Sequence, residues 1–366
     1  MEVSLCKLRR TGGPASFCLS CAKGYTDHWV DFIARRLFPD VGYRHIVLTV
    51  PEFLHPWFYH HPELLSPFMQ VGHACLSDVL AACAGIPLDI GSIIVLQTGG
   101  RAGNYNPHLH ILLTGGGLTS KGTWKPISYI PFTLIHRKWQ YHLLTMLRNH
   151  IDDPRIHHDV DRAWKKYPRG LVAFVDKGKV PPGGKGLARY LAKYVVSPPI
   201  SVRRIQHYDG QRVRYGYRDH RTEQIQYATL PVQRFIGRMV QHILPKGFPR
   251  IRYSGLHAHV RYAAVRDHLA EILPSHPLLP ANSFRVLPHK SFVQRFFEAF
   301  ALNPLLCQDC GHLMELELIH HPQYGTLRTY ELFEDEPRPQ PFPVRSSSRS
   351  PLYRPESVVQ LSLPFL

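Results

Sequence analysis

The sequence predicts an α+β fold in which helices flank a central, mostly antiparallel sheet, with a small N-terminal segment spaced like a zinc knuckle. Two observations predict the fold class. The expected elements run strand, helix, strand, strand, helix, strand, helix, which is not the strict alternation of a parallel α/β fold. Two apolar strands, 90–98 and 108–114, also follow one another across a Gly- and Asn-rich loop, as in a hairpin.

Each expected element has a local signal. The segment 26–38 is amphipathic, with Asp27 near its start and Pro39 at its end, and is therefore expected to be a helix. In the strand 43–50, apolar residues recur at every second position. The remaining elements, in order, are a helix at 64–84, strands at 90–98 and 108–114, a helix at 132–151, a short strand at 171–175, a helix at 186–196, two or three polar strands within 200–229 with a hairpin turn at Asp209-Gly210, and a helix at 230–243.

The composition indicates a polyanionic partner. Lys and Arg number 44 against 27 Asp and Glu, so the formal net charge is +17. Such a surplus fits nucleic acid or an anionic membrane surface. Nucleic acid is favoured, because apolar runs such as 93–97 are far too short to cross a bilayer. The first six residues lack the charged start and apolar core of a signal peptide, so we expect a cytoplasmic protein without a membrane partner.

A His-x-His motif lies in the second strand of the expected hairpin, within residues 107–117 (PHLHILLTGGG). Residues i and i+2 of a strand point to one face, so His108 and His110 can direct two imidazoles at one metal ion. With 24 His in 366 residues, about 1.6 such motifs are expected by chance, and a second is present at His257–His259. The alternative is a pair of histidines on a polar strand face.

Two tyrosines lie one turn apart in the expected helix 186–196. Tyr190 and Tyr194 share one helical face, which Lys193 and Arg189 border. Core packing is the alternative for aromatic residues at this spacing. A phenol, with a pKa of about 10, becomes a useful nucleophile when a metal polarises the phosphate and cations offset the developing charge. Attack on DNA would give a 5′-phosphotyrosine and a free 3′-OH, and two tyrosines would permit two successive attacks.

With both motifs in this order, the chain resembles a known family. The segments 107–117 and 188–194 (ARYLAKY) are similar to the two-tyrosine rolling-circle transposases of bacterial insertion sequences of the IS-ninety-one type, in the HUH endonuclease superfamily. Tyr190-x-x-Lys193 also resembles a motif of rolling-circle replication initiators. Segments 199–204 and 242–256 are similar to blocks that follow the tyrosine helix and the catalytic domain. The resemblance covers roughly residues 15–260 and implies a Rep-like HUH fold.

This resemblance implies a divalent metal, Mg²⁺ or Mn²⁺, on His108 and His110, and Tyr190 and Tyr194 as nucleophiles, with Lys193 beside them. A third ligand is normally a polar residue on a neighbouring strand.

Gln97 is expected to be that third ligand, because its strand pairs with the histidine strand and its carbonyl oxygen suits these metals. Glu52 is a weaker alternative, and Gln97 facing solvent is the other.

Four of the seven cysteines form two Cys-x2-Cys pairs, a spacing typical of zinc knuckles. Cys18 and Cys21 resemble the last pair of the zinc module that precedes the nuclease in this family, with Cys6 as a further candidate ligand. The other upstream ligands of that module are missing, and His28 is a candidate substitute. A second candidate knuckle combines the remaining pair with nearby histidines: Cys307, Cys310, His320 and His321. Cys75 and Cys83 lie in an apolar stretch and are expected to be buried thiols.

Five segments are expected along the chain: a partial zinc-binding module at 1–25, the nuclease domain at 26–229, a helical, basic DNA-binding extension at 230–276, a C-terminal region at 277–334 that begins with a linker, and a disordered tail at 335–366. The basic residues expected to bind DNA are Arg189, Arg203, Arg204, Lys246, Arg250 and Arg252. Tyr208, Tyr215 and Tyr217 are candidates for stacking on unpaired bases, with strand-face packing as the alternative.

The leading hypothesis is a metal-dependent, ATP-independent enzyme that nicks and rejoins single-stranded or hairpin DNA at the ends of a mobile element and inserts it into target DNA. Such a protein would act in the bacterial cytoplasm, at the nucleoid. Two alternatives remain. The chain could be a rolling-circle replication initiator or relaxase with the same chemistry, or a catalytically inactive, zinc-containing DNA-binding protein derived from a transposase.

Overall fold

The computed structural model describes residues 29, 32–38, 41–175, 200, 204–219 and 222–273, together with 303, 305–306, 312–314, 318–321 and 325–329. The expected tyrosine helix at 186–196, the cysteine pairs, the linker at 277–291 and the tail from 335 lie outside the described residues.

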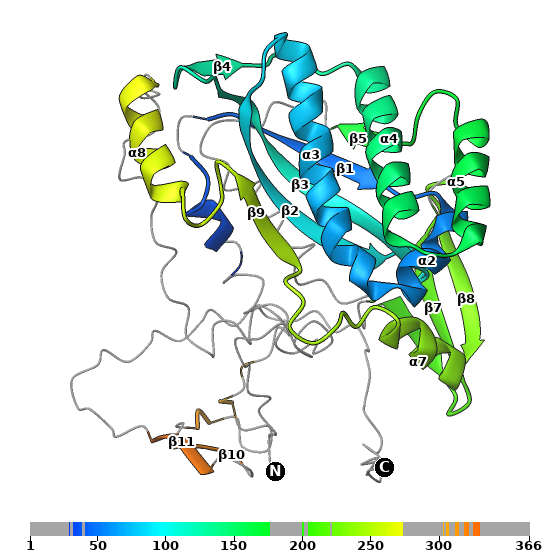
Figure 1. Cartoon of the computed structure of the whole chain (residues 1–366). Helices are drawn as coiled ribbons and strands as arrows, with labels where there is room; N and C mark the ends of the chain where they lie inside the picture. The colour runs from blue at the N-terminus through cyan, green and yellow to red at the C-terminus, as the bar shows by residue number, and fades with distance from the viewer. Residues whose placement is uncertain are drawn as a thin grey trace. The chain divides into compact units, whose positions relative to one another are not determined.

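A central sheet organises the described chain (Figure 1). Its strands lie in the order β5-β1-β3-β2-β9, β4 pairs with β3, and every pair is antiparallel. The expected α+β class, with a mostly antiparallel sheet, is therefore confirmed. The six strands are β1 (Tyr43–Thr49), β2 (Asp89–Gly99), β3 (Tyr105–Leu118), β4 (Trp124–Pro126), β5 (Ala173–Val175) and β9 (Ile251–Gly255).

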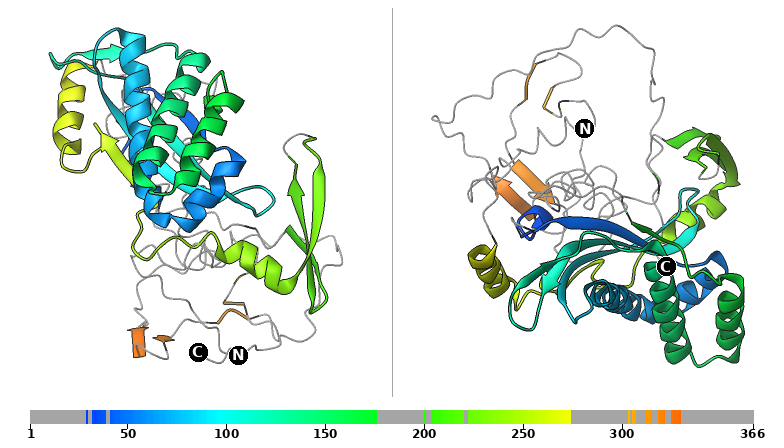
Figure 2. Two further views of the ribbon diagram at one scale, coloured as in Figure 1. Left: turned by 45° about the vertical axis from the view of Figure 1, so that its right-hand side comes forward. Right: turned by 90° about the horizontal axis from the view of Figure 1, so that it is seen from above.

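Helices cover one face of this sheet (Figures 1 and 2). They are α2 (His55–His60), α3 (Leu65–Ala84), α4 (Phe132–His150) and α5 (Pro154–Lys166), with the short 3-10 helices η2 (Glu52–Leu54) and η3 (Pro62–Leu64) beside α2. Leu109 and Ile111 of β3 join these helices in the main hydrophobic core. Trp139 of α4 is fully buried there, and its indole N–H donates to the carbonyl of Thr49 at 2.8 Å. The apolar positions of β3 are thus fixed against the helical layer.

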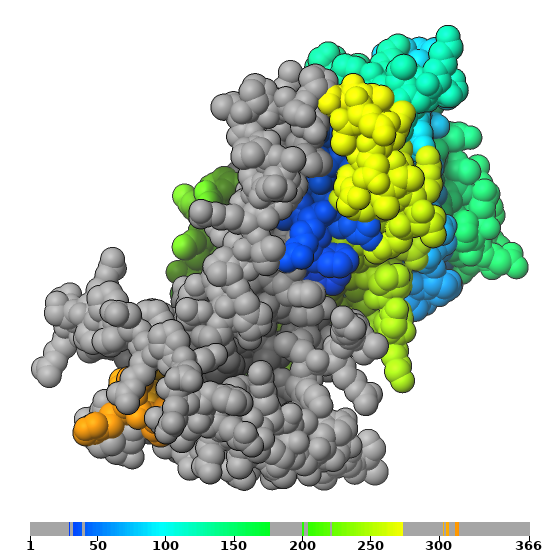
Figure 3. Space-filling model, turned by 90° about the vertical axis from the view of Figure 1, so that its left-hand side faces the viewer, coloured from blue at the N-terminus to red at the C-terminus, as the bar shows by residue number. Residues whose placement is uncertain are grey.

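A second, smaller core lies on the opposite face of the sheet. Phe38, Leu112 and Val95 belong to it, with Val265 and Leu269 from α8 (Tyr262–Ile272). The segment that ends at residue 38 packs against α8, as Figure 3 shows in blue and yellow, and the hydroxyl of Tyr262 donates to the carbonyl of Arg35. This core covers one part of the face and leaves out the part that carries His108 and His110.

A separate three-stranded antiparallel sheet consists of β6 (Ile205–Tyr208), β7 (Arg212–Arg218) and β8 (Ile225–Pro231), and α7 (Val232–Val240) packs against it. The predicted turn at Asp209-Gly210 joins β6 to β7: Gly210 has φ 89°, and the Asp209 carboxylate accepts from the backbone N–H of Gln211 and Arg212. Side chains anchor this sheet to the β2–β3 loop, because Tyr215 donates to the carbonyl of Ala102 and Gln241 to that of Gly103.

In the second unit of the chain, 314–366, β10 (Leu318–His321) and β11 (Gly325–Thr329) form an antiparallel pair.

The sequence did not predict α2, β4, α5, β9 or α8. The strand β9 comes from the expected extension 230–276, yet it pairs with β2 in the central sheet. Its residues, IRYSG, alternate over only two apolar positions, Ile251 and Tyr253, which pack against the second core, while Arg252 between them donates to Ser66 of α3. The helix α5 buries only three residues, Ile156, Val160 and Ala163.

Candidate functional site

The strand β3 places His108 and His110 on one face of the central sheet, as the motif predicts. Leu109 and Ile111 face the helical layer, so the two histidines face away from it. Their ring centroids are 5.0 Å apart. His110 is buried and His108 is partly exposed.

Gln97 lies beside this pair. Its strand β2 pairs with β3 so that Gln97 is directly opposite His108, and its Oε1 is 3.2 Å from Nε2 of His110. The structure therefore brings the three predicted ligand side chains together. Glu52, the alternative ligand, is an exposed residue at the start of η2.

The hydrogen bonds of both imidazoles define their tautomers. Nδ1 of His108 donates to the carbonyl of Asn106 at 2.7 Å, so its Nε2 carries the lone pair. Nδ1 of His110 is 3.1 Å from Nε2 of His45, a residue of β1 that the sequence did not single out. If His110 donates to His45, its own Nε2 also carries a lone pair, directed toward Gln97. If His45 donates instead, His110 donates to Gln97 Oε1. The first arrangement is the one that a metal requires.

Burial keeps these imidazoles neutral. It lowers the pKa of His110 to about 2, with smaller effects of the same sign from His108 and His45. Burial likewise lowers the pKa of His108, although its bond to the Asn106 carbonyl opposes the shift. Neutral imidazoles can bind a metal at neutral pH without first losing a proton.

A donor set of two imidazoles and one amide oxygen fits a hard or borderline divalent cation. Within the described residues, no three His, Cys, Asp or Glu side chains lie together in a group that could hold a metal ion. Gln97, whose Oε1 lies beside His110, could supply a third protein ligand at the His108–His110 pair.

The predicted nucleophiles follow a strand of the same sheet. The strand β5 pairs with β1, two strands from β3, and its Phe174 lies opposite Val47, which in turn lies opposite His110. Val175 is the last residue of β5 and the last described residue before the segment 176–199. Tyr190, Tyr194, Lys193 and Arg189 lie in the segment 176–199, outside the described residues.

The predicted DNA-binding cations have different surroundings. Lys246 is exposed and Arg250 is partly exposed. Arg252 is partly buried, and its guanidinium donates to the Ser66 hydroxyl at 2.6 Å in contact with the helical layer. Arg204 is also partly buried, and it donates to the carbonyls of Gly216 and Arg101. Arg252 and Arg204 thus have structural contacts. Arg203 lies outside the described residues.

Among the three candidate stacking tyrosines, Tyr215 follows the alternative, strand-face packing, and not base stacking. This side chain is fully buried, and its hydroxyl donates to Ala102 and accepts from Arg238 at 2.9 Å. It belongs to the face of β7 that packs on α7. Tyr208 is exposed and Tyr217 is partly exposed.

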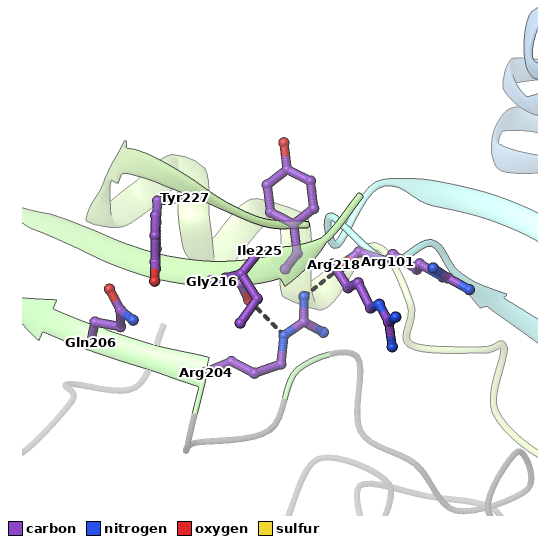
Figure 4. A pocket seen from close by; sticks show the side chains of 8 residues that line it. Arg101, Arg204, Gln206, Gly216, Arg218, Ile225 and Tyr227 are labelled. Atoms are coloured by element: carbon purple, nitrogen blue, oxygen red, sulfur yellow. Dashed lines mark hydrogen bonds between the residues drawn. The ribbon is translucent and has the colours of Figure 1, made fainter. Parts of the chain in front are cut away.

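The arginines of the strands at 203–221 are expected to hold phosphates, but Arg101 and Tyr227, which lie at the opposite face of the three-stranded sheet, were not singled out from the sequence. A hollow of about 450 Å³ lies there, lined by Arg204, Gln206, Gly216, Ile225 and Tyr227 of this sheet and by Arg101 of the β2–β3 loop (Figure 4). Tyr217 and Arg218 complete its lining. The alternation along β7, with Arg at 212, 214 and 218 and Gly at 216, is a signal that could have indicated this face.

The second His-x-His motif has a structural role. His257 is fully buried, stacks on Phe38 at 4.6 Å between ring centroids, and shares a hydrogen bond with the Tyr43 hydroxyl. His259 contacts Arg36 instead. Of the two thiols expected to be buried, Cys75 is buried, whereas Cys83 is only partly buried, against the main core.

Comparison with known proteins bears on these observations. Residues 91–264 match the family Y2_Tnp, "Putative transposase". The matched region includes β2, β3, the three-stranded sheet and the tyrosine segment.

Two curated relatives are similar over longer stretches. "Transposase for insertion sequence element IS801" from Pseudomonas savastanoi pv. phaseolicola is 32% identical over 248 residues, which are 65% of this chain and 59% of that protein. "Putative transposase y4qJ" from Sinorhizobium fredii (strain NBRC 101917 / NGR234) is 27% identical over 323 residues, 82% of this chain and 79% of that protein. The chain thus spans about three fifths of the first relative. No solved structure matches it.

Within the part of the chain that the structure describes, no helix combines the length and apolar character needed to cross a membrane.

Proposed function

We propose that this chain is a transposase that nicks and rejoins single-stranded DNA through a 5′-phosphotyrosine and so drives rolling-circle transposition of an insertion sequence. One observation carries the proposal: His108, His110 and Gln97 converge on one face of the sheet, with both histidines neutral and His108 in the tautomer that a metal requires. The similarity to named transposases supports it.

The three converging side chains would hold Mg²⁺ or Mn²⁺. When bound, such a cation polarises the scissile phosphate and offsets its charge. The protein's own part is orientation. The Asn106 carbonyl fixes the ring of His108, and His45 occupies Nδ1 of His110, so that both Nε2 atoms can present lone pairs on one side.

Tyr190 or Tyr194 would supply the nucleophile. The phenol oxygen attacks the scissile phosphorus, the bond from phosphorus to the 3′ oxygen breaks, and the proton lost by the phenol reaches the leaving 3′ oxygen through solvent. The new phosphotyrosine conserves the energy of the broken bond, so rejoining by a 3′-OH needs no ATP. Lys193, three residues from Tyr190, would offset the charge that develops on the phosphate.

The partner would be single-stranded or hairpin DNA at the element's ends, and then the target DNA. The formal net charge of +17 supports this choice, with Arg189, Arg203, Lys246 and Arg250 as candidate phosphate contacts. Zinc at the Cys18/Cys21 and Cys307/Cys310 pairs, and action at the bacterial nucleoid, belong to the same proposal.

The test uses the full chain, Mn²⁺ and labelled single-stranded oligonucleotides that carry the element's ends. We expect a protein–DNA adduct that survives denaturation, forms in either Tyr190→Phe or Tyr194→Phe, and is absent from the double variant. His110→Gln should lose the adduct. Its matched control is His259→Gln, in the second His-x-His motif, which should keep the adduct. DNA binding without any adduct would contradict the proposal and favour an inactive DNA-binding protein. Nicking that initiates replication of a plasmid origin, without excision of an element, would favour an initiator.

A further inference from the structure

The face of the three-stranded sheet that points away from α7 is basic, and it carries one glycine among its arginines. Arg212, Arg214, Gly216 and Arg218 alternate along β7, on the face opposite the buried Val213 and Tyr215. Three arginines therefore flank one glycine on a single strand face. A sheet face of this kind presents cations to a polyanion.

Gly216 is one of the residues that line the hollow of about 450 Å³, and it is itself buried. It lies directly opposite Tyr227 of β8, and a Cβ at this position would be 3.3 Å from Cε1 of that ring. The absence of a side chain at Gly216 therefore lets the tyrosine ring lie close to the strand, while Tyr227 itself stays 48% exposed. The guanidinium of Arg214, which does not line the hollow, lies 4.9 Å from the ring centroid and holds the ring from another side.

The lining combines apolar and cationic groups (Figure 4). Tyr227 and Ile225 are exposed, at 48% and 64%, although both are large and apolar. Arg204 and Gln206 lie across from them, and Arg101 borders the hollow from the β2–β3 loop. The volume is in the lower part of the range of small-molecule sites, about 300–1,000 Å³, so it suits one small planar group with an anionic attachment.

The charge at the rim is positive, and one carboxylate partly offsets it. Glu223 lies 2.7 Å from Arg218 and 3.7 Å from Arg101, and all three side chains are more than half exposed. Exposed ion pairs are weak, so a phosphate can replace Glu223 on either arginine at little cost. The rim can therefore exchange an internal carboxylate for a phosphate.

We infer that this hollow binds one unpaired nucleotide of single-stranded DNA, with the base against Tyr227 above Gly216 and a neighbouring phosphate on Arg218 and Arg101. Base stacking on an aromatic ring and ion pairing to the backbone are the two interactions by which proteins hold single strands. A base within a duplex is stacked on both faces and cannot enter. The inference rests on the proposed function for the choice of DNA.

The location fits that function. Arg101 belongs to the loop that joins β2 to β3, and the same two strands carry Gln97 and His108. One single strand could therefore engage the hollow and the His108–His110 pair through adjoining parts of the fold. The hollow would hold the single strand while the site at His108 and His110 acts on a phosphate farther along the same strand.

The test is binding in EDTA, so that no nicking is required. Fluorescence anisotropy would measure the affinity of the full chain for a fluorescein-labelled oligo-dT and for a duplex of equal length. We expect Tyr227→Leu to weaken single-strand binding by about five- to a hundredfold, as for the loss of one stacked base. Arg218→Gln should lower the slope of log affinity against log salt by about 0.7, as for one lost phosphate contact. Glu223→Gln should tighten binding, because it frees both arginines.

Matched controls lie on the helical layer. Tyr141→Leu removes an equally exposed tyrosine of α4, and Arg148→Gln breaks an exposed ion pair with Asp161; neither should change affinity. A 2-aminopurine placed in the oligonucleotide should be quenched by the wild type and not by Tyr227→Leu. Wild-type affinity in Tyr227→Leu, or an equal loss for duplex and single strand, would overturn the inference. Binding in EDTA involves no nicking. A failure of the adduct experiment, which tests the proposed function, would therefore not change this result.

Discussion

Nε2 of His45 lies 3.1 Å from Nδ1 of His110, on the side of the imidazole away from Gln97. His45 is almost fully buried, and its ring is nearly parallel to that of His110, at 8°. When Nε2 of His45 accepts the hydrogen bond from Nδ1 of His110, His110 is in the tautomer whose Nε2 can bind a metal. His45 is therefore a positioning residue for the proposed metal site.

Replacing His45 by leucine should weaken metal binding by about ten- to a hundredfold, the usual effect of losing such a partner. The measurement is the Mn²⁺ concentration that gives half-maximal adduct formation. His45→Gln, which keeps a hydrogen-bonding group, should recover part of the affinity. A variant that lowers only the melting temperature, with an unchanged Mn²⁺ requirement, would show that His45 merely fills the core.

Variants of the proposed metal ligands should lose nicking but keep DNA binding. His108→Ala and Gln97→Ala should abolish or strongly reduce nicking, because each removes a donor, while leaving single-strand affinity in EDTA near that of the wild type. Gln97→Glu should retain nicking, since a carboxylate is also a hard oxygen ligand. Nicking assays and anisotropy on the same preparations give both readouts. Full nicking by Gln97→Ala would remove Gln97 from the ligand set.

Acid should destabilise the fold partly through His257. Burial lowers the pKa of this imidazole from about 6.5, its value in the unfolded chain, to about 3. Between these values the unfolded chain binds one more proton at this site, so the free energy of unfolding falls as pH drops, by up to about 1.4 kcal/mol per pH unit. The contribution is absent above about pH 7.

Urea unfolding at pH 7, 6 and 5 would measure this effect. His257→Phe keeps the stacking on Phe38 and removes the titrating group, so its stability should depend less steeply on pH. His259→Phe, at the exposed histidine of the same motif, is the control: slight burial and Arg36 lower the pKa of His259 as well, but by less, so this variant should change the slope less than His257→Phe. Equal slopes for the wild type and His257→Phe would contradict the assignment.

The sequence predicted those features that depend on local pattern. Alternation placed Leu109 and Ile111 in the core and hence His108 and His110 on the other face. The hairpin order placed Gln97 on the strand that pairs with the histidine strand, and the structure adds the register that sets it opposite His108. His45 was not predicted, because its approach to His110 depends on the register of β1 with β3, which residues far apart in the chain determine.

The sequence also could not predict which tyrosines of the three-stranded sheet are exposed. Tyr215 and Tyr227 lie on adjacent strands of one polar sheet, and either face could have been buried. Phe235 and Met239 of α7 pack against one of the two faces. Tyr215 lies on that face and is buried, whereas Tyr227 lies on the other face and stays exposed. A pattern with polar residues on both faces does not specify the buried face. The roles of Tyr190 and Tyr194 stay predictions from the motif and the resemblance.

The attachment of β9 to the central sheet gives the last prediction. Gly255 ends β9 with φ +60°, and a Cβ there would lie 1.8 Å from the carbonyl oxygen of Ile90 in β2. Gly255→Ala must therefore displace backbone in addition to adopting an unfavourable φ. We expect a loss of about 2–4 kcal/mol in the free energy of unfolding.

Gly237→Ala is the matched control, because Gly237 lies inside α7 with nothing within 4 Å of the added Cβ. It should stabilise the protein by about 0.5–1 kcal/mol, the usual gain from alanine over glycine in a helix. Urea unfolding gives both values, and hydrogen exchange of the β2 amides at 91–95 should accelerate only in Gly255→Ala. Unchanged stability in Gly255→Ala would mean that β9 is not part of the cooperative sheet, and that 230–276 folds as the separate extension that the sequence suggested.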